Sequence, residues 1–144
     1  MRALLDVNVL IALMDATHTF HGRAHEWWQV HAAEGWASCP LVENGAVRIM
    51  THPGYSASRR FRPEEILSCL AKFVEATNHE FWHDSISLRD PRLFASDRIH
   101  RSQAVTDLYL LALACERGGQ LVTFDRGIPL SAVPLAQPGN LCVL

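Results

Sequence analysis

The stretch LLDVNVLIAL, residues 4–13, holds a carboxylate, Asp6, and an amide, Asn8, inside an otherwise unbroken apolar run. Burying an ionised carboxylate costs several kcal/mol unless a partner compensates for the lost water. Residues 2–5 fit a short buried strand, and residues 7–14 fit a helix that begins directly after it. Asp6 therefore stands at the carboxyl end of a strand, where its partner is a helix backbone, an arginine or a metal ion.

Helical and strand-like segments alternate along the rest of the chain. Apolar periodicity and the positions of proline and glycine predict helices over residues 21–35, 40–50, 62–77 and 102–119, and a short helix or turn within 90–99. Apolar runs between them predict strands over residues 36–40, 79–83, 120–124 and 140–144. This alternation predicts an α/β sandwich with a largely parallel sheet, as a single domain spanning residues 1–144. Ligands of parallel sheets bind outside the carboxyl ends of the strands.

The composition is that of an ordinary globular protein, with 49% hydrophobic and 19% charged residues. No apolar run approaches the ~20 residues of a membrane span, and the N-terminus lacks the pattern of an export signal. We therefore expect a cytoplasmic protein without a membrane partner. The cysteines are scattered without a CxxC pair, which favours buried free thiols in a reducing compartment: Cys39, Cys69, Cys115 and Cys142.

Three further acids share with Asp6 a place at the inner or carboxyl-end side of their elements. Asp125 directly follows the predicted strand 120–124. Glu43 and Asp107 each lead an apolar stripe along their predicted helices, with apolar residues at i+3, i+4 and i+7. Taken alone, each acid has an ordinary explanation as a helix cap, a turn residue, an ion-pair partner or an acid favoured by the helix dipole.

Four such coincidences together predict that the acids converge. Converging carboxylates must share protons or a cation, and an oxygen-rich site of this kind suits Mg²⁺ or Mn²⁺. A shared cation would then be the missing partner of Asp6. Three polar residues lie beside the acids in the sequence and are candidates to orient them through hydrogen bonds: Asn8, Thr106 and Thr123.

Positive charge gathers in two short clusters, although the net charge is −2. The clusters are RRFR, residues 59–62, and RIHR, residues 98–101. All but one of the 13 basic residues are arginine. The planar fork of arginine suits bidentate phosphate contacts, but a GC-rich genome produces the same bias. Both explanations stay open.

Four motifs, in this order along the chain, resemble those of the PIN-domain ribonucleases, and within that family the VapC toxins of bacterial toxin–antitoxin pairs. They are LLDVNVLIAL with Asp6, LVENGAVRIM with Glu43, VTDLYLLALA with Asp107 and VTFDRG with Asp125. Each motif is weak alone, but the ordered set is fairly specific and spans nearly the whole chain. The resemblance implies a three-layer α/β/α PIN-like sandwich.

Carried over to this chain, the resemblance implies that four acids form the catalytic cluster: Asp6, Glu43, Asp107 and Asp125. Asp6, Asp107 and Asp125 would bind the metal, Mg²⁺ or Mn²⁺. The motifs of Asp6 and Asp107 match best, whereas the fourth acid varies in position within the family and Asp97 is a weaker candidate contributor. Five arginines are candidates to hold RNA phosphates, with solvated surface side chains as the alternative: Arg59, Arg60, Arg62, Arg98 and Arg101.

The resemblance also implies a function and partners. The chain would be a metal-dependent endoribonuclease, the toxin of a toxin–antitoxin pair, which cleaves structured RNA by means of a metal-activated water. Transfer RNA is the substrate implied first, and ribosomal RNA second. We further expect a cognate antitoxin that inserts a basic residue among the carboxylates, and a homodimer of the toxin.

Two other functions stand as alternatives. The first is a non-catalytic PIN-like interaction module. The second is an Asp-phosphorylated α/β domain, which fits less well: an aspartate-nucleophile phosphatase needs a second Asp where this chain has Asn8. A signal-receiver domain needs a lysine near a late strand end, whereas the only lysine, Lys72, falls in a predicted helix.

Two histidines and three tryptophans fit structural roles better than sites. His21 and His25 have the one-turn spacing of zinc ligands, but without an HExxH glutamate they fit a non-catalytic helix face. Trp27, Trp28 and Trp36 fit a core or an interface better than a platform for stacked bases.

Overall fold

A five-stranded parallel sheet forms the centre of the protein, whose computed structural model describes residues 1–144. The strands lie in the order β3-β2-β1-β4-β5, with the bounds β1 (Ala3–Leu5), β2 (Trp36–Ser38), β3 (His79–Phe81), β4 (Gln120–Thr123) and β5 (Leu141–Val143). Leu4 of the central strand β1 pairs with Ala37 of β2 and with Leu121 of β4. Every pairing is parallel, which confirms the predicted type of sheet.

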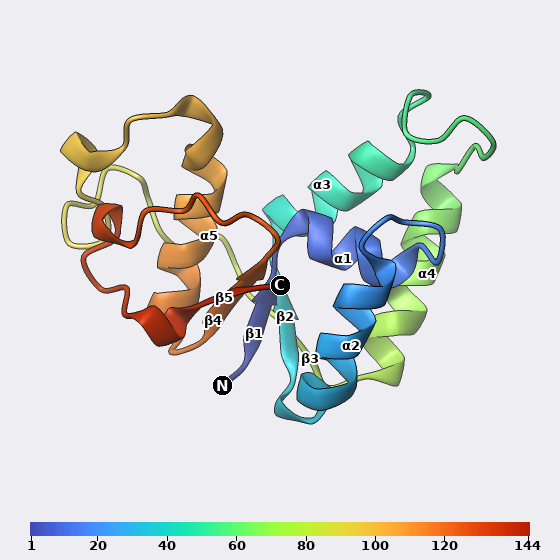
Figure 1. Cartoon of the computed structure of the whole chain (residues 1–144), viewed down its shortest axis with the longest axis horizontal. Helices are drawn as coiled ribbons and strands as arrows, with labels where there is room; N and C mark the ends of the chain where they lie inside the picture. Colours follow the sequence, from blue (N-terminus) through green and yellow to red (C-terminus); the bar gives the residue numbers. More distant parts are fainter.

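Helices cover both faces of this sheet and complete three layers. The α-helices are α1 (Val7–Met14), α2 (His21–His31), α3 (Pro40–Met50), α4 (Pro63–Ala76) and α5 (Val105–Glu116). Figure 1 shows α1 to α4 on one side of the sheet and α5 on the other, which confirms the three-layer α/β/α sandwich. Short 3₁₀ helices span Ala32–Glu34, Ser96–Arg98, Ser102–Ala104, Leu130–Ala132 and Pro138–Asn140.

The predicted elements are all present. Helix α4 is shorter than predicted by one residue at each end, and two other helices differ more. The helix expected over 21–35 ends at His31, and a 3₁₀ turn leads to Gly35, whose φ of 84° favours glycine. The helix expected over 102–119 begins with a 3₁₀ turn, so α5 starts at Val105. Both differences lie at helix ends, where tightened turns are common.

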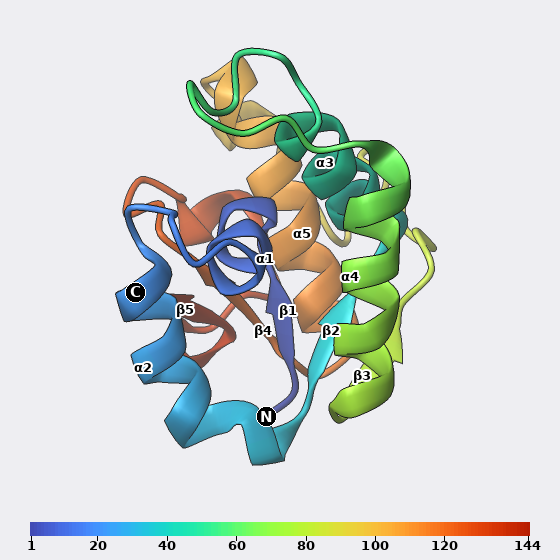
Figure 2. The same ribbon diagram turned by 90° about the vertical axis from the view of Figure 1, so that its right-hand side faces the viewer.

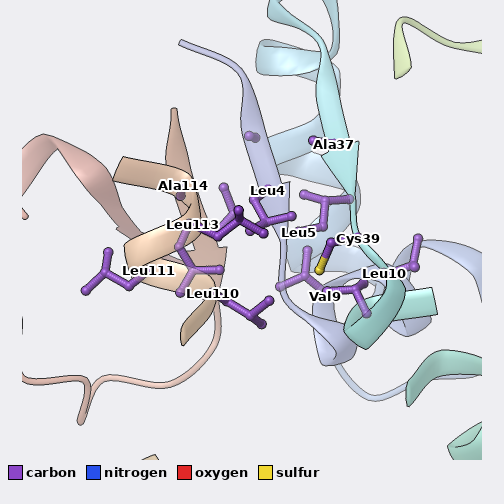
Figure 3. Close-up of a cluster of buried hydrophobic side chains, with 14 of the residues drawn as sticks. Leu4, Leu5, Val9, Leu10, Ala37, Cys39, Leu110, Leu111, Leu113 and Ala114 are labelled. Atoms are coloured by element: carbon purple, nitrogen blue, oxygen red, sulfur yellow. The ribbon is translucent and has the colours of Figure 1, made fainter. Parts of the chain in front are cut away.

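The core is built where β1 lies between α1 and α5. Leu4 and Leu5 of β1 are fully buried, and Figure 3 shows them between side chains of α1 and of α5. Residues 108–114 of α5 are buried all round the helix. Each fully buried leucine contributes ~1.5–3 kcal/mol relative to an exposed one. This packing holds both the end of β1 and the start of α5 in place.

The crossing of α1 and α3 depends on one glycine. A Cβ atom at Gly45 would lie 2.9 Å from Cγ2 of Val7, closer than side chains tolerate. The missing side chain therefore lets α3 approach α1 next to Asp6, two residues beyond Glu43 on the same helix.

The four cysteines are free, as predicted, but most are not buried. Cys39 is buried, Cys69 is exposed, and Cys115 and Cys142 are partly exposed. The expectation of buried thiols was therefore wrong for three of them, because they lie on outer helix and strand surfaces. None of the helices has both the length and the apolar character needed to span a membrane.

Candidate active site

Asp6 is held by groups from two elements. It ends β1, and its own backbone N–H donates to the carbonyl of Val122 in β4 at 2.9 Å. One carboxylate oxygen accepts from the backbone N–H of Val7 at 2.6 Å, which caps α1. The other accepts from the hydroxyl of Thr123 at 2.9 Å. The cap of α1 thus engages only one of the two carboxylate oxygens of Asp6.

The same threonine also orients the neighbouring acid. The backbone N–H of Asp125 donates to the Thr123 hydroxyl at 3.0 Å, and the N–H of Gly127 donates to the Asp125 carboxylate at 2.6 Å. Thr123 therefore ties Asp6 and Asp125 to each other across the ends of β1 and β4.

Asp107 completes a group of three acids from the first turn of α5. It is half-buried, and burial together with the negative charges of Asp6 and Asp125 raises the pKa of Asp107 to about 6. Burial also raises the pKa of Asp6 above its ordinary value, despite the hydrogen bonds from Thr123 and Val7, and the charge of Asp125 adds to the shift. The structure thus brings Asp6, Asp107 and Asp125 within electrostatic range of one another.

Glu43 is held separately from these three acids. Its Oε1 atom accepts from the hydroxyl of Ser38 at 2.6 Å, and the Ser38 oxygen lies 2.8 Å from Nε2 of His79. Glu43 is not among the charges that shift the pKa of Asp6 or Asp107. The sequence analysis missed Ser38 and His79, although the position of Ser38 at the carboxyl end of β2 was a usable signal.

Another acid that the sequence analysis missed lies at this end of the sheet. Asp84 follows β3, and its charge adds to burial in raising the pKa of the Cys39 thiol to about 11. Asp84 likewise adds to burial in raising the pKa of Tyr109 on α5. Asp97, by contrast, is exposed on the 3₁₀ helix Ser96–Arg98 and is not among the charges that act on Asp107.

Of the three polar residues predicted to orient the acids, only Thr123 makes hydrogen bonds to them. Asn8 and Thr106 are exposed, and neither side chain forms a hydrogen bond to a carboxylate. Asn8 and Thr106 each lie next to a position of their helix that is less exposed, but they are themselves exposed. Their predicted role stays a prediction.

The two arginine clusters lie in different surroundings at the same end of the molecule. Arg101 donates to the carbonyl of Gly127 at 3.0 Å, and its charge partly counters the raised pKa of Asp107. A hollow of about 460 Å³ opens there, lined by Arg98, His100, Arg101, Ala104, Leu108, Gly127 and Pro129. Figures 1 and 2 both show the segment that precedes α5 and the loop after α3 at the end of the molecule toward which the strands point.

The side chains of the RRFR cluster contact groups in their own loop and in the first turn of α4. The Arg59 guanidinium lies 4.6 Å from the centre of the Phe61 ring. Arg60 donates to the carbonyls of Pro53 and Ser56, and Arg62 pairs with Glu64 at 2.8 Å. These arginines lie in the segment between α3 and α4, and Arg59 acts on Asp15 rather than on the three acids.

The histidines and tryptophans for which the sequence predicted structural roles lie in such positions. Nδ1 of His21 lies 2.7 Å from the carbonyl of Ala12, and its ring contacts that of His25 at 4.2 Å. Trp36 is fully buried, and Trp27 and Trp28 pack partly buried against the core.

The donor chemistry of the three acids fits a hard cation. Carboxylate oxygens are the donors that Mg²⁺ and Mn²⁺ prefer, and the raised pKa of Asp107 records a repulsion that a cation would relieve. In the structure no three His, Cys, Asp or Glu side chains are yet arranged closely enough to hold a metal ion. Side-chain rotation of the exposed Asp125 would be part of binding one.

Comparisons with known proteins agree with this geometry. The family model described as "PIN domain" matches residues 3–133. Ribonuclease VapC44 of Mycobacterium tuberculosis is 42% identical over 144 residues, covering 100% of both chains. Ribonuclease VapC39 of the same organism is 38% identical over 132 residues, or 92% of this chain and 94% of that one.

A solved structure matches the fold. It is the crystal structure of VapBC2 from Rickettsia felis bound to a DNA fragment from their promoter, with a TM-score of 0.55, 15% identity, and coverage of 100% of this chain and 98% of that one. At this identity the likeness concerns the fold alone. The match to the family model and the identity to the mycobacterial proteins carry the assignment: the chain belongs to the PIN-domain family, among the VapC ribonucleases.

Proposed function

We propose that this protein is a divalent-metal-dependent endoribonuclease that acts as the toxin of a toxin–antitoxin pair and cleaves structured RNA, with transfer RNA as the first candidate substrate. One observation carries the proposal: Asp6, Asp107 and Asp125 come from three separate elements and repel one another at the carboxyl end of the sheet. Repulsion among these acids lowers the stability of the metal-free protein, and carboxylates with pKa values perturbed in this way are typical of functional sites. The proposed substrate places the enzyme in the cytoplasm.

Asp6, Asp107 and Asp125 would hold Mg²⁺ or Mn²⁺. The bound ion would polarise the scissile phosphate and activate the attacking water. Thr123 keeps Asp6 and Asp125 in register by its hydroxyl. Ser38 engages Oε1 of Glu43, so the second carboxylate oxygen of Glu43 is available to accept a hydrogen bond from water. Glu43 therefore suits a role in orienting water beside the acids.

Positive charge beside the acids would offset the repulsion between them and an RNA backbone. The hollow at Arg98 and Arg101 adjoins Asp107, so these two side chains are placed to contact phosphates next to the cleaved bond. Arg59, Arg60 and Arg62 would contact RNA farther along, because they lie at the far end of α3. Phosphate contacts of this kind position RNA without reading its sequence.

An antitoxin is the proposed protein partner. The solved structure that matches the fold is that of VapBC2 bound to a DNA fragment from their promoter. In this chain a hollow of about 580 Å³, largely apolar, lies between the ends of α1, α3 and α4, lined by Met14, Asp15, Ala16, Met50, Arg59, Arg60, Phe61, Glu65, Ile66 and Cys69. We propose that an antitoxin segment docks there and reaches the carboxylates with a basic residue. We also expect a homodimer, which light scattering at micromolar concentration would test.

RNA cleavage tests the proposal directly. Purified protein is incubated with total cellular RNA, with and without Mg²⁺ or Mn²⁺, and new 5′ ends are mapped. We expect metal-dependent cuts that the Asp107→Asn variant loses. Asp97→Asn is the matched control, because Asp97 is an exposed acid outside the group. Intact RNA in every lane, from folded protein free of antitoxin, would favour the non-catalytic interaction module.

A further inference from the structure

An aromatic pair, with one ring exposed and the other partly buried, lies next to Asp125. Phe124 stands between Thr123 and Asp125 in the chain, and its ring centre lies 4.8 Å from that of Phe20. Phe20 precedes α2, and Figure 2 shows this segment close to the loop that follows β4. Phe20 is 38% exposed, so part of its ring is open to solvent.

Positive and polar groups surround this pair. The Arg23 guanidinium lies 5.6 Å from the centre of the Phe20 ring, is exposed, and forms none of the ion pairs of the structure. The His18 ring lies 6.0 Å from the Phe20 ring. The exposed surface therefore combines an aromatic face with an uncompensated cation.

We propose that Phe20 and Phe124 form a platform on which one base of the RNA stacks, with Arg23 contacting an adjoining phosphate. The inference rests on the proposed function and names the contact that places a nucleotide at the acids. Single-stranded RNA is recognised by stacking of splayed bases on aromatic rings. Because consecutive Cα atoms are only ~3.8 Å apart, a base on Phe124 would place its phosphates close to Asp125.

Charge complementarity favours a nucleotide over an apolar protein segment. An apolar partner would cover the rings but leave the charge of Arg23 without a counterion. A nucleotide supplies both an aromatic face and a phosphate. The acids repel phosphates in general, so a contact that binds the base as well as the phosphate is suited to a position next to them.

RNA binding without cleavage tests the platform. Fluorescence anisotropy measures the affinity of the full chain, in EDTA, for a short labelled oligoadenylate and for an abasic ribose-phosphate strand of equal length. The variants are Phe20→Ala, Phe20→Trp and Arg23→Ala. Val30→Ala is the matched control, because Val30 is a 73% exposed apolar residue on the same helix, away from the pair. Circular dichroism verifies that each variant folds.

We expect Phe20→Ala to weaken oligoadenylate binding roughly 5- to 150-fold, the loss of one stacked base, and to leave abasic binding unchanged. Phe20→Trp should retain binding. Arg23→Ala should weaken both strands and lower the slope of log affinity against log salt by about one. Val30→Ala should match the wild type.

Equal oligoadenylate affinity of Phe20→Ala and wild type, in a protein that cleaves RNA, would overturn the platform alone. So would an equal loss with the abasic strand, or a loss of antitoxin binding with RNA affinity unchanged, which would assign the pair to the antitoxin. Failure of the wild type both to bind and to cleave RNA would instead overturn the proposed function.

Discussion

Helix α1 has a buried aspartate at each end, and the two behave in opposite ways. Asp6 before the helix is 7% exposed, and Asp15 after it is 6% exposed. Burial raises the pKa of Asp6, whereas the pKa of Asp15 lies below its ordinary value because hydrogen bonds outweigh its burial. Similar exposure therefore does not fix the pKa of a carboxylate. Burial outweighs the hydrogen bonds at Asp6, whereas the hydrogen bonds outweigh burial at Asp15.

Asp15 is fully satisfied by donors. It accepts from the Tyr55 hydroxyl at 2.6 Å, and from the backbone N–H and hydroxyl of Thr17 at 2.9 and 2.8 Å. The nearby charge of Arg59 lowers the pKa of Asp15 further. This carboxylate joins the loop after α3 to the end of α1, and its role is structural.

Asp6 has fewer donors and faces other acids. It accepts one bond from Val7 and one from Thr123, and no basic side chain pairs with it. A buried acid whose neighbours are also acids is costly, which is characteristic of functional sites. Asp6, which we propose as a metal ligand, thus differs from the structural Asp15 at the other end of α1 in the donors and charges around it.

The largest expected effect is on catalysis at Asp6. Asp6→Asn should lower the rate of RNA cleavage roughly 10³-fold or more. The variant lacks a negative charge that would hold the proposed cation, and such a cation stabilises the transition state by several kcal/mol. Its thermal stability should equal or exceed that of the wild type, since a neutral amide is easier to bury. A cleavage assay and a melting curve on one preparation measure both. Strong destabilisation would place Asp6 with Asp15 as a structural residue.

The reverse result is expected at Asp15. Asp15→Ala should lower the free energy of unfolding by ~2–4 kcal/mol, because it breaks several hydrogen bonds to a charged group and leaves the Tyr55 hydroxyl without its acceptor. Tyr55→Phe should cost ~1–2 kcal/mol. Urea titration of both variants and of the double variant should show less than additive losses. Additive losses would show that the two groups act independently.

Thr123 should affect activity more than stability. Thr123→Val keeps the shape but removes the hydroxyl that binds Asp6 and Asp125, so we expect a roughly 10- to 100-fold loss of cleavage. Thr123→Ser should retain most of the activity because it keeps the hydroxyl. Equal activity of the valine and serine variants would show that the backbone alone positions the acids.

The smallest expected effect is a pH-dependent shift in melting temperature. The pKa of Asp107 is about 6 in the folded protein, against an ordinary 3.8, so the folded state binds the proton more tightly. Stability in metal-free buffer should therefore fall as pH rises from 3.8 to about 6. Asp107→Asn should melt with the wild type below this range and a few degrees higher above it.

Magnesium extends the same measurement. At about pH 7 Mg²⁺ should raise the melting temperature of the wild type, because it binds the folded state only, and should leave that of Asp107→Asn nearly unchanged. An equal rise in both proteins would show that the ion binds elsewhere.

Local patterns predicted the elements well. The bounds of α1 and α3 match the predicted 7–14 and 40–50, because Asp6 and Pro40 mark their starts and apolar periodicity marks their length. The same patterns predicted that Asp6 and Asp125 follow strands and that Asp107 faces inward. The meeting of these three acids followed from the parallel sheet, whose strands end at one edge. Glu43 was predicted to join them, but it is held separately by the hydroxyl of Ser38, which the sequence analysis did not single out.

The sequence was sufficient for the kind and order of the elements and for the family, because caps, periodicity and motifs depend on neighbouring residues. It did not reveal which groups hold each acid. Thr123 reaches Asp6 across 117 positions, and Tyr55 reaches Asp15 across 40. Phe20 meets Phe124 because α2 begins close to the point where β4 ends. Such pairs form through the packing of whole elements, so the distinction between the hydrogen-bonded Asp15 and Asp6, the proposed metal ligand, arises only in the folded protein.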